Sequence, residues 1–172
     1  MGVSQVQSWG HVSPEVKEMI VESVERGWAT SNSWESLQSQ IAGEFGKRFG
    51  TDNVAENVKV SELGVQGSDA EIDVVTSADL GDPELGGFLL QISGGSAYPR
   101  HEKELLEFIS VSAVNKRFQI GVLIVSCDNT MKLEGGRSSW DYCRGSLLRL
   151  VTPGLEHSTL TGLLIVGLPR PK

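Results

Sequence analysis

Two stretches decide the fold of this chain, Asp69-Ala-Glu-Ile-Asp73-Val-Val and Gly87-Phe-Leu-Leu-Gln-Ile-Ser93. Each is an apolar run of strand length that carries polar side chains on one face. Because strand residues two apart point to the same face, Glu71 and Asp73 are expected side by side. Carboxylates that project from adjacent strands can hold a hard divalent cation against a phosphate group. The acidic pair therefore predicts a metal site at these strands.

The composition limits the classes of function. The 172 residues fit one domain, and 39% hydrophobic with 22% charged residues is typical of a soluble globular protein. A net charge of -7 and a pI near 5.0 argue against binding nucleic acid through general positive charge. A local basic cleft stays compatible with that balance. Cys127 and Cys143 form no CxxC pair, so they predict buried thiols and neither a disulfide framework nor a zinc site.

The ends of the chain and its apolar runs indicate where the protein works. Residues 1–12 are largely polar and are expected to be flexible, and residues 1–172 as a whole are expected to form a single domain. No apolar run reaches the roughly 18 residues that a membrane span needs, and no secretory leader is apparent. We therefore expect a cytoplasmic protein without a membrane partner.

The spacing of apolar residues predicts four helices, over residues 14–26, 33–48, 100–116 and 139–151. The first begins with Ser13 as N-cap and Pro14 at the first helical position, and Gly27 is expected to end it. The second opens with Asn32 and Glu35, which are spaced as a capping box.

Strand patterns occur at residues 58–61, 70–75, 88–93, 119–126 and 160–168. Short links, including a turn at 81–87, predict that the first three strands form an antiparallel meander. The fourth is apolar on both faces, so we expect a central strand that is parallel to its neighbour and is reached by a crossover helix. The order of elements predicts an α/β domain with a mixed five-stranded sheet flanked by helices.

This order, together with several short motifs, resembles the PD-(D/E)XK nuclease superfamily, and within it the BamHI, BglII and BstYI branch of type II restriction endonucleases. The motifs are Glu-Ile-Asp73, Leu-Leu-Gln-Ile-Ser-Gly-Gly from residue 89, Gly-Val-Leu-Ile-Val125 and Leu-Leu-Ile-Val-Gly-Leu168. The resemblance implies a three-layer restriction-endonuclease-like core, Mg²⁺ or Mn²⁺ as cofactor, double-stranded DNA as substrate and a homodimer.

The family's active-site motif is degenerate in this chain. Asp73 resembles the metal-binding aspartate of the family. Gln91 can be matched in two ways: as the glutamine of a Glu-x-Gln pair, with Leu89 in place of the acid, or as a replacement of the acid itself, with Ser93 in place of the final polar group. Leucine cannot bind a cation, and a neutral amide does not balance its charge.

Two further carboxylates could restore the metal site. Glu71 is the nearest acid to Asp73 on the expected face, and Glu35 resembles the helix-borne glutamate of the superfamily. The resemblance thus implies Asp73, Glu71 and Glu35 as metal ligands, and Asp73, Glu71, Gln91 and Ser93 as the catalytic set. Such a site would hydrolyse a phosphodiester, because a divalent ion activates water and stabilises the charge of the transition state.

Basic residues near the predicted strand and helix ends are candidates for contacts with DNA phosphates: Arg100, Lys103, Lys116, Arg117 and Arg137. Two functions stay open from the sequence. One is metal-dependent DNA hydrolysis with Asp73 as the main ligand. The other is a catalytically inactive module of the same fold that binds DNA or a protein.

Overall fold

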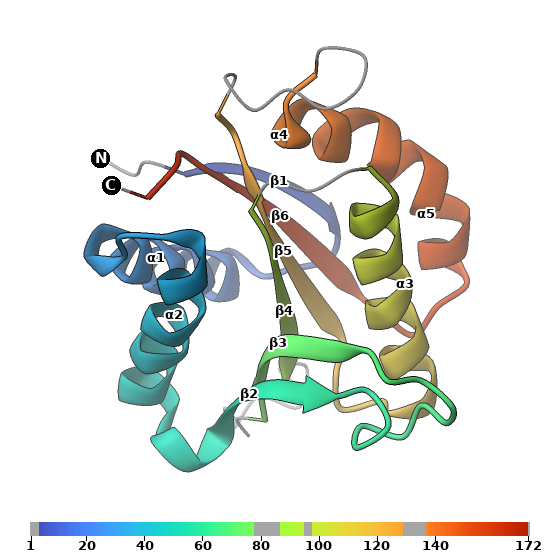
Figure 1. The fold of residues 1–172 in the computed structure, drawn as a ribbon. Helices are drawn as coiled ribbons and strands as arrows, with labels where there is room; N and C mark the ends of the chain where they lie inside the picture. Colours follow the sequence, from blue (N-terminus) through green and yellow to red (C-terminus); the bar gives the residue numbers. More distant parts are fainter. Residues whose placement is uncertain (1–3, 78–86, 95–97, 129–136, 172) are drawn as a thin grey trace.

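One mixed sheet forms the centre of the molecule. The computed structural model describes residues 4–77, 87–94, 98–128 and 137–171, and these residues form six strands in the order β1-β6-β5-β4-β3-β2 (Figure 1). The strands are β1 (Gln5–Gly10), β2 (Val54–Lys59), β3 (Glu71–Thr76), β4 (Phe88–Ser93), β5 (Ile120–Ser126) and β6 (Gly162–Leu168). The turn expected at 81–87 falls, apart from its last residue, outside the described residues.

Helices cover both faces of the sheet, which gives three layers (Figure 1). One face packs against α1 (Pro14–Thr30) and α2 (Trp34–Phe49), and the single turn η1 (Thr51–Asn53) leads from α2 to β2. The other face packs against α3 (Tyr98–Val114), α4 (Ser139–Asp141), the π-helix η2 (Tyr142–Leu147) and α5 (Leu148–Glu156). None of the described helices is both long and apolar enough to cross a membrane.

The pairing of the strands confirms the predicted connectivity. β2, β3 and β4 are antiparallel neighbours, and β4, β5 and β6 run parallel. Every residue of β4, β5 and β6 is buried, as expected for parallel strands covered by helices on both faces. The apolar side chains of these strands alternate between the two cores, with Leu90 and Ile92 facing α1 and α2 and Leu89 facing α3.

The prediction of five strands is wrong because it misses β1. Residues 5–10, expected to be flexible, pair antiparallel with β6 at the edge of the sheet. All six side chains of β1 are exposed or half-buried, so the sequence Gln-Val-Gln-Ser-Trp-Gly has only a weak apolar alternation. Main-chain hydrogen bonds to β6 hold the strand, and a side-chain pattern does not encode them.

The first and last predicted helices also differ from the structure. α1 continues past Gly27 to Thr30, because this glycine allows close packing of α1 on α2: a Cβ atom there would lie 2.7 Å from Ile41 Cγ1. The helix expected at 139–151 instead comprises α4, the π-helix η2 and α5 and ends at Glu156. Neither the packing role of Gly27 nor the π-helix has a signal in the apolar spacing.

The carboxyl ends of the parallel strands and the starts of two helices lie at the same end of the sheet. β4 leads into α3 and β5 leads into α4, and His101 Nε2 lies 3.2 Å from Ser139 Oγ, which joins the first turns of these helices. We call this end of the sheet, where the parallel strands finish, the carboxyl edge. Ligands of open α/β sheets commonly bind at the carboxyl ends of strands, so side chains at this edge are the first candidates for function.

Candidate functional site

β3 and β4 separate from each other at Asp73. Their ladder pairs Thr76 with Phe88, Val75 with Leu89 and Val74 with Leu90, and the regular pairing ends there. Beyond it, the main-chain N–H of Asp73 donates to Gln91 Oε1 at 3.1 Å, and the N–H of Ile92 donates to Asp73 Oδ2 at 2.6 Å. Side chains therefore replace the main-chain hydrogen bonds, and the carboxylate of Asp73 is held between the two strands.

Gln91 connects three elements. In addition to the bond from Asp73, its Nε2 donates to the carbonyl oxygen of Glu71 at 2.8 Å and to Glu107 Oε2 on α3 at 2.9 Å. The side chain is almost fully buried, with 3% exposure. Both ends of the amide are thus engaged in fixing β3, β4 and α3 to one another, which makes Gln91 a structural side chain.

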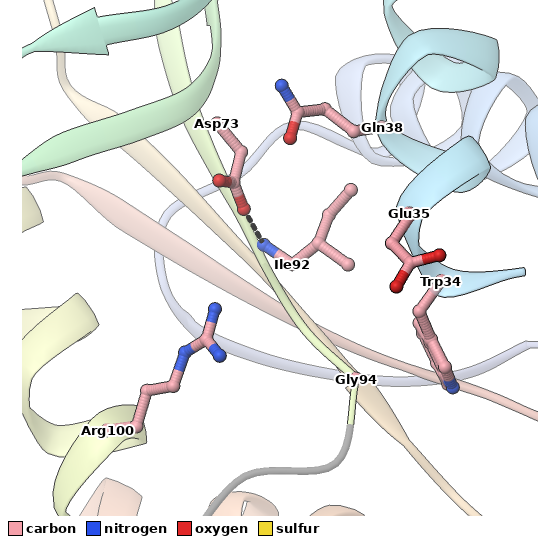
Figure 2. A pocket seen from close by; sticks show the side chains of 7 residues that line it. All are labelled: Trp34, Glu35, Gln38, Asp73, Ile92, Gly94 and Arg100. Atoms are coloured by element: carbon pink, nitrogen blue, oxygen red, sulfur yellow. Dashed lines mark hydrogen bonds between the residues drawn. The ribbon is translucent and has the colours of Figure 1, made fainter.

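A pocket of about 370 Å³ opens beside Asp73 at the carboxyl edge. Figure 2 shows Glu35, Gln38 and Arg100 with their polar ends turned toward the same space as the Asp73 carboxylate. Three layers of the fold contribute to it: α2, the two separating strands and the first turn of α3. The lining residues are Trp34, Glu35, Gln38, Asp73, Ile92, Gly94 and Arg100.

The start of α2 explains why Glu35 faces this pocket. Asn32 and Glu35 do not form the predicted capping box, because Ser33 and Ser36 form it: Ser33 Oγ accepts the N–H of Ser36, and Ser36 Oγ accepts the N–H of Ser33. The serines satisfy the helix end, so the Glu35 carboxylate is not needed there. Its position one turn before Gln38 places both side chains on the same face of α2.

Gly94 allows α2 to approach the end of β4. A Cβ atom at this position would lie 2.4 Å from Trp34 Cδ2, so any larger residue would displace the indole ring. Trp34 and Gly94 therefore form one wall of the pocket as a packed pair. Neither residue was predicted as part of the site, and a glycine directly after a strand is the signal that the sequence offers for this pair.

Burial dominates the protonation of Asp73. It raises the pKa of this carboxyl from 3.8 to about 6, although the hydrogen bond from the Ile92 N–H acts in the opposite direction. The nearby Glu104 and Glu107 raise the pKa further, and Arg100 lowers it. Asp73 is therefore ionised only in part at pH 6, which is typical of a functional carboxylate.

α3 places buried polar groups behind the pocket. Glu104 is 5% exposed, its Oε1 accepts from Arg100 Nε at 2.9 Å, and its Oε2 has no hydrogen-bond partner among the described residues. Nδ1 of the fully buried His101 lies 3.8 Å from that oxygen. The sequence analysis did not select Glu104, although its spacing of four residues from Arg100 is a usable signal.

The other predicted site residues lie outside this pocket. Glu71 is exposed, and only its carbonyl oxygen contacts the site, through Gln91. Ser93 is fully buried, and its Oγ has no partner in the part of the chain that the structure describes. Leu89 is buried in the core opposite Val75. Neither way of matching the degenerate motif therefore brings an acid from β4 to Asp73.

The predicted DNA contacts divide between two edges of the sheet. Arg100 and Lys103 lie on α3, where they pair with Glu104 and Glu107 at 2.9 and 3.6 Å. Arg137 precedes α4 at the same carboxyl edge. Lys116 and Arg117 precede β5, and because β5 is parallel to β4 they lie at the opposite edge, where Arg117 donates to the carbonyl oxygen of Ser77. The five side chains do not form one surface.

The charges around Asp73 decide what the pocket can bind. Among the described residues of the lining, Arg100 is the one basic side chain, and its Nε is paired with Glu104. Asp73 and Glu35 line the pocket as carboxylates, and Glu104 and Glu107, which pair with Arg100 and Lys103, act on Asp73 from α3. Negative groups outnumber positive ones, so this environment favours a cation and repels a bare phosphate.

The carboxylates of this pocket suit only a metal site in which water and substrate supply most of the ligands. Across the described residues, no group of three or more His, Cys, Asp and Glu side chains lies close enough together to hold a metal ion. Asp73, Glu71 and Glu35 thus do not form the predicted three-carboxylate site. Mg²⁺, however, commonly takes one or two protein carboxylates and completes its shell with waters and substrate phosphates. Asp73 and Glu35 line one pocket, and their carboxylates are of the type that such an arrangement uses.

Comparison with known proteins identifies the fold class. No family model and no curated protein matches the sequence. Among solved structures, the chain is similar to the restriction endonuclease BglII, in its crystal structure complexed with a DNA 16-mer. The TM-score is 0.56 at 12% sequence identity, and the match covers 96% of this chain and 77% of that one. The protein therefore has a restriction-endonuclease-like fold.

The role of Gln91 can be tested by removing its amide. Gln91→Leu would leave the Asp73 N–H, the Glu71 carbonyl and the Glu107 carboxylate without this partner. We expect the free energy of unfolding in urea to fall by about 2 to 4 kcal/mol. Gln38→Leu is the matched control, because Gln38 bonds only to exposed groups, Glu56 and Asn57, and should change stability by less than about 0.5 kcal/mol. Equal effects of the two substitutions would contradict the structural role.

The raised pKa of Asp73 predicts a pH-dependent stability. The folded state binds its proton more tightly than the unfolded state, so the wild type loses stability as the pH rises from about 4 to about 6. Asp73→Asn should therefore be more stable than the wild type at pH 8, by about 1 to 2 kcal/mol after allowance for solvent screening, and equal to it below about pH 4. Urea titrations at both pH values measure this, with Glu71→Gln as an exposed control. A destabilised Asn variant at pH 8 would refute the prediction.

Proposed function

We propose that this protein acts on double-stranded DNA as a metal-dependent phosphodiester hydrolase, with Asp73 and Glu35 as the carboxylates that hold Mg²⁺ or Mn²⁺. The observation that carries the proposal is the excess of negative charge around a buried carboxylate in a pocket at the carboxyl edge. A phosphate could enter this pocket only together with a cation. The similarity in fold to an endonuclease in complex with DNA supports DNA as the substrate class.

Each polar residue of the pocket has a role in this proposal. Asp73 is oriented by the N–H of Ile92, which holds one carboxylate oxygen while the other stays available for the ion. Glu35 approaches from α2 on the opposite side of the pocket. Arg100 provides hydrogen-bond donors for a phosphate oxygen, as guanidinium groups do at phosphoryl sites. A bound divalent ion would supply the activated water and neutralise the developing charge.

A second candidate is favoured by the contacts of Gln91. The amide of this residue is fully engaged, and β4 carries neither an acid nor a lysine. A module of the same fold that binds DNA without cleaving it would need no second acid. The homodimer and the cytoplasmic location stay expectations from the sequence under either candidate.

Cleavage of plasmid DNA separates the two candidates. With Mg²⁺ or Mn²⁺ at pH 7.5, the wild type should nick the plasmid, and Asp73→Asn and Glu35→Gln should each lower the rate by about 100-fold or more. Because the ion requires an ionised Asp73, the wild-type rate should rise with pH through about 6. Glu71→Gln is the matched control and should retain activity.

The outcomes have distinct meanings. Cleavage that survives Asp73→Asn would refute the site. If the wild type does not cleave but binds duplex DNA, the non-cleaving module is favoured. In that case Asp73→Asn should bind DNA more tightly in EDTA, because it removes a negative charge from the pocket. A metal-dependent site predicts the opposite for binding in Mn²⁺, where the Asn variant should lose affinity.

A further inference from the structure

A second pocket, lined by residues of α4, η2 and α5 together with Arg137, is basic. It has a volume of about 460 Å³ and is lined by Arg137, Asp141, Arg144, Gly145, Ser146 and Arg149. Three guanidinium groups and one carboxylate line it, a surplus of two positive charges in a chain whose net charge is -7. Like charges on an exposed surface normally separate, so their convergence needs a structural cause or a ligand.

Part of the reason why the three arginines converge is structural, because a hydrogen bond to a neighbouring group holds each of them in place. Arg137 Nη1 donates to Ser146 Oγ at 2.8 Å. Arg144 donates to Asp141 Oδ1 through both Nε and Nη2, at 3.1 and 3.0 Å. Arg149 Nε donates to the carbonyl oxygen of Gly145 at 3.4 Å. A guanidinium group has five N–H donors. Each anchor therefore fixes one side of an arginine and leaves further donors for an acceptor in the pocket.

The π-helix η2 brings these residues together. Tyr142–Leu147 is closed by bonds of the i→i+5 type, and π-turns are rare and frequently mark functional sites. The widened turn carries Arg144, Gly145 and Ser146 and allows Arg149, five residues after Arg144, to face the same hollow. A Cβ atom at Gly145 would meet no atom within 4 Å, so the hollow has open space beside this glycine.

The chemistry of the lining selects the ligand class. Planar guanidinium forks bind phosphate oxygens in pairs, and phosphate is the anion for which arginine is best suited. The pocket follows β5 as the Asp73 pocket follows β4, and the bond between His101 and Ser139 joins the helices that carry them. A polyanion long enough to reach from one pocket to the other could contact both.

We propose that Arg137, Arg144 and Arg149 form a metal-independent site for backbone phosphates of nucleic acid. In its choice of ligand this inference rests on the proposed function, because it takes the same DNA as the ligand. It differs from that function in the requirement for metal: the Asp73 pocket needs a cation to accept a phosphate, whereas the arginine pocket carries its own positive charge. Duplex DNA should thus bind through this site when EDTA is present.

The test measures binding of a labelled duplex of about 20 base pairs by fluorescence anisotropy in EDTA, over a range of salt concentrations. The wild type should bind, and the double variant Arg144→Gln/Arg149→Gln should bind at least about tenfold more weakly at low salt. The slope of log K against log salt should decrease in magnitude by about 2, since two phosphate contacts are lost. Both side chains are exposed, and thermal unfolding will confirm that the variant folds.

The matched control is Arg26→Gln/Arg48→Gln, which removes the same charge from α1 and α2, where both arginines face Glu22. It should change affinity by less than about twofold. An equal loss in both double variants, or no binding of the duplex by the wild type in EDTA, would overturn the proposal. Should the Gln variant fail to fold, Arg144→Lys/Arg149→Lys replaces it and should retain the salt slope while it weakens binding.

Two further measurements distinguish nucleic acid from free phosphate as the ligand, and this proposal from the proposed function. Inorganic pyrophosphate that displaces the duplex at an equal phosphate concentration would assign the pocket to free phosphates and overturn the assignment to nucleic acid. Asp73→Asn in EDTA should keep the contribution of the arginine pocket, so the salt slope should stay at the wild-type value. Absence of metal-dependent cleavage by the wild type, together with an intact salt slope, would sink the proposed function alone.

Discussion

The exchange of hydrogen bonds between Asp73 and β4 is the interaction on which the rest of the site depends. The Asp73 N–H is taken by the Gln91 side chain, and the Ile92 N–H is taken by the Asp73 side chain. These two bonds end the β3–β4 ladder without leaving main-chain groups unpaired in a buried position. They also open the space between the strands, and the pocket lined by Glu35 and Arg100 lies there.

Charge then determines what this space can accept. The carboxylates of Asp73, Glu35 and Glu104 outnumber the guanidinium of Arg100, and the burial of Asp73 and Glu104 strengthens the repulsion between these two. A cation relieves that repulsion, and a phosphate alone increases it. The arginine pocket beside α4 has the opposite balance. Under the two proposals, the pockets would divide the recognition of a phosphodiester chain into a metal-dependent and a metal-independent part.

The sequence predicted the elements with strong periodicity and failed where tertiary packing decides. The buried strands β4 to β6 were found because apolar runs of this kind occur in covered parallel sheets. β1 was missed because its main-chain pairing has no side-chain pattern, and the end of α1 was misplaced because Gly27 serves packing. In the site, Asp73 and Glu35 were named from the sequence and lie in one pocket. The expected pairing of Glu71 with Asp73 rested on strand periodicity, which fails where the strands part.

The central claim is that Asp73 and Glu35 share one divalent ion. The most direct measurement is the anomalous scattering of Mn²⁺ in crystals grown at pH 7.5 with the metal. The account predicts one strong peak at about 2.0 to 2.2 Å from a carboxylate oxygen of each residue, with remaining ligands from water or phosphate. A pocket without a peak, or a Mn²⁺ ion bound to Asp73 while Glu35 stays outside its coordination shell, would contradict it.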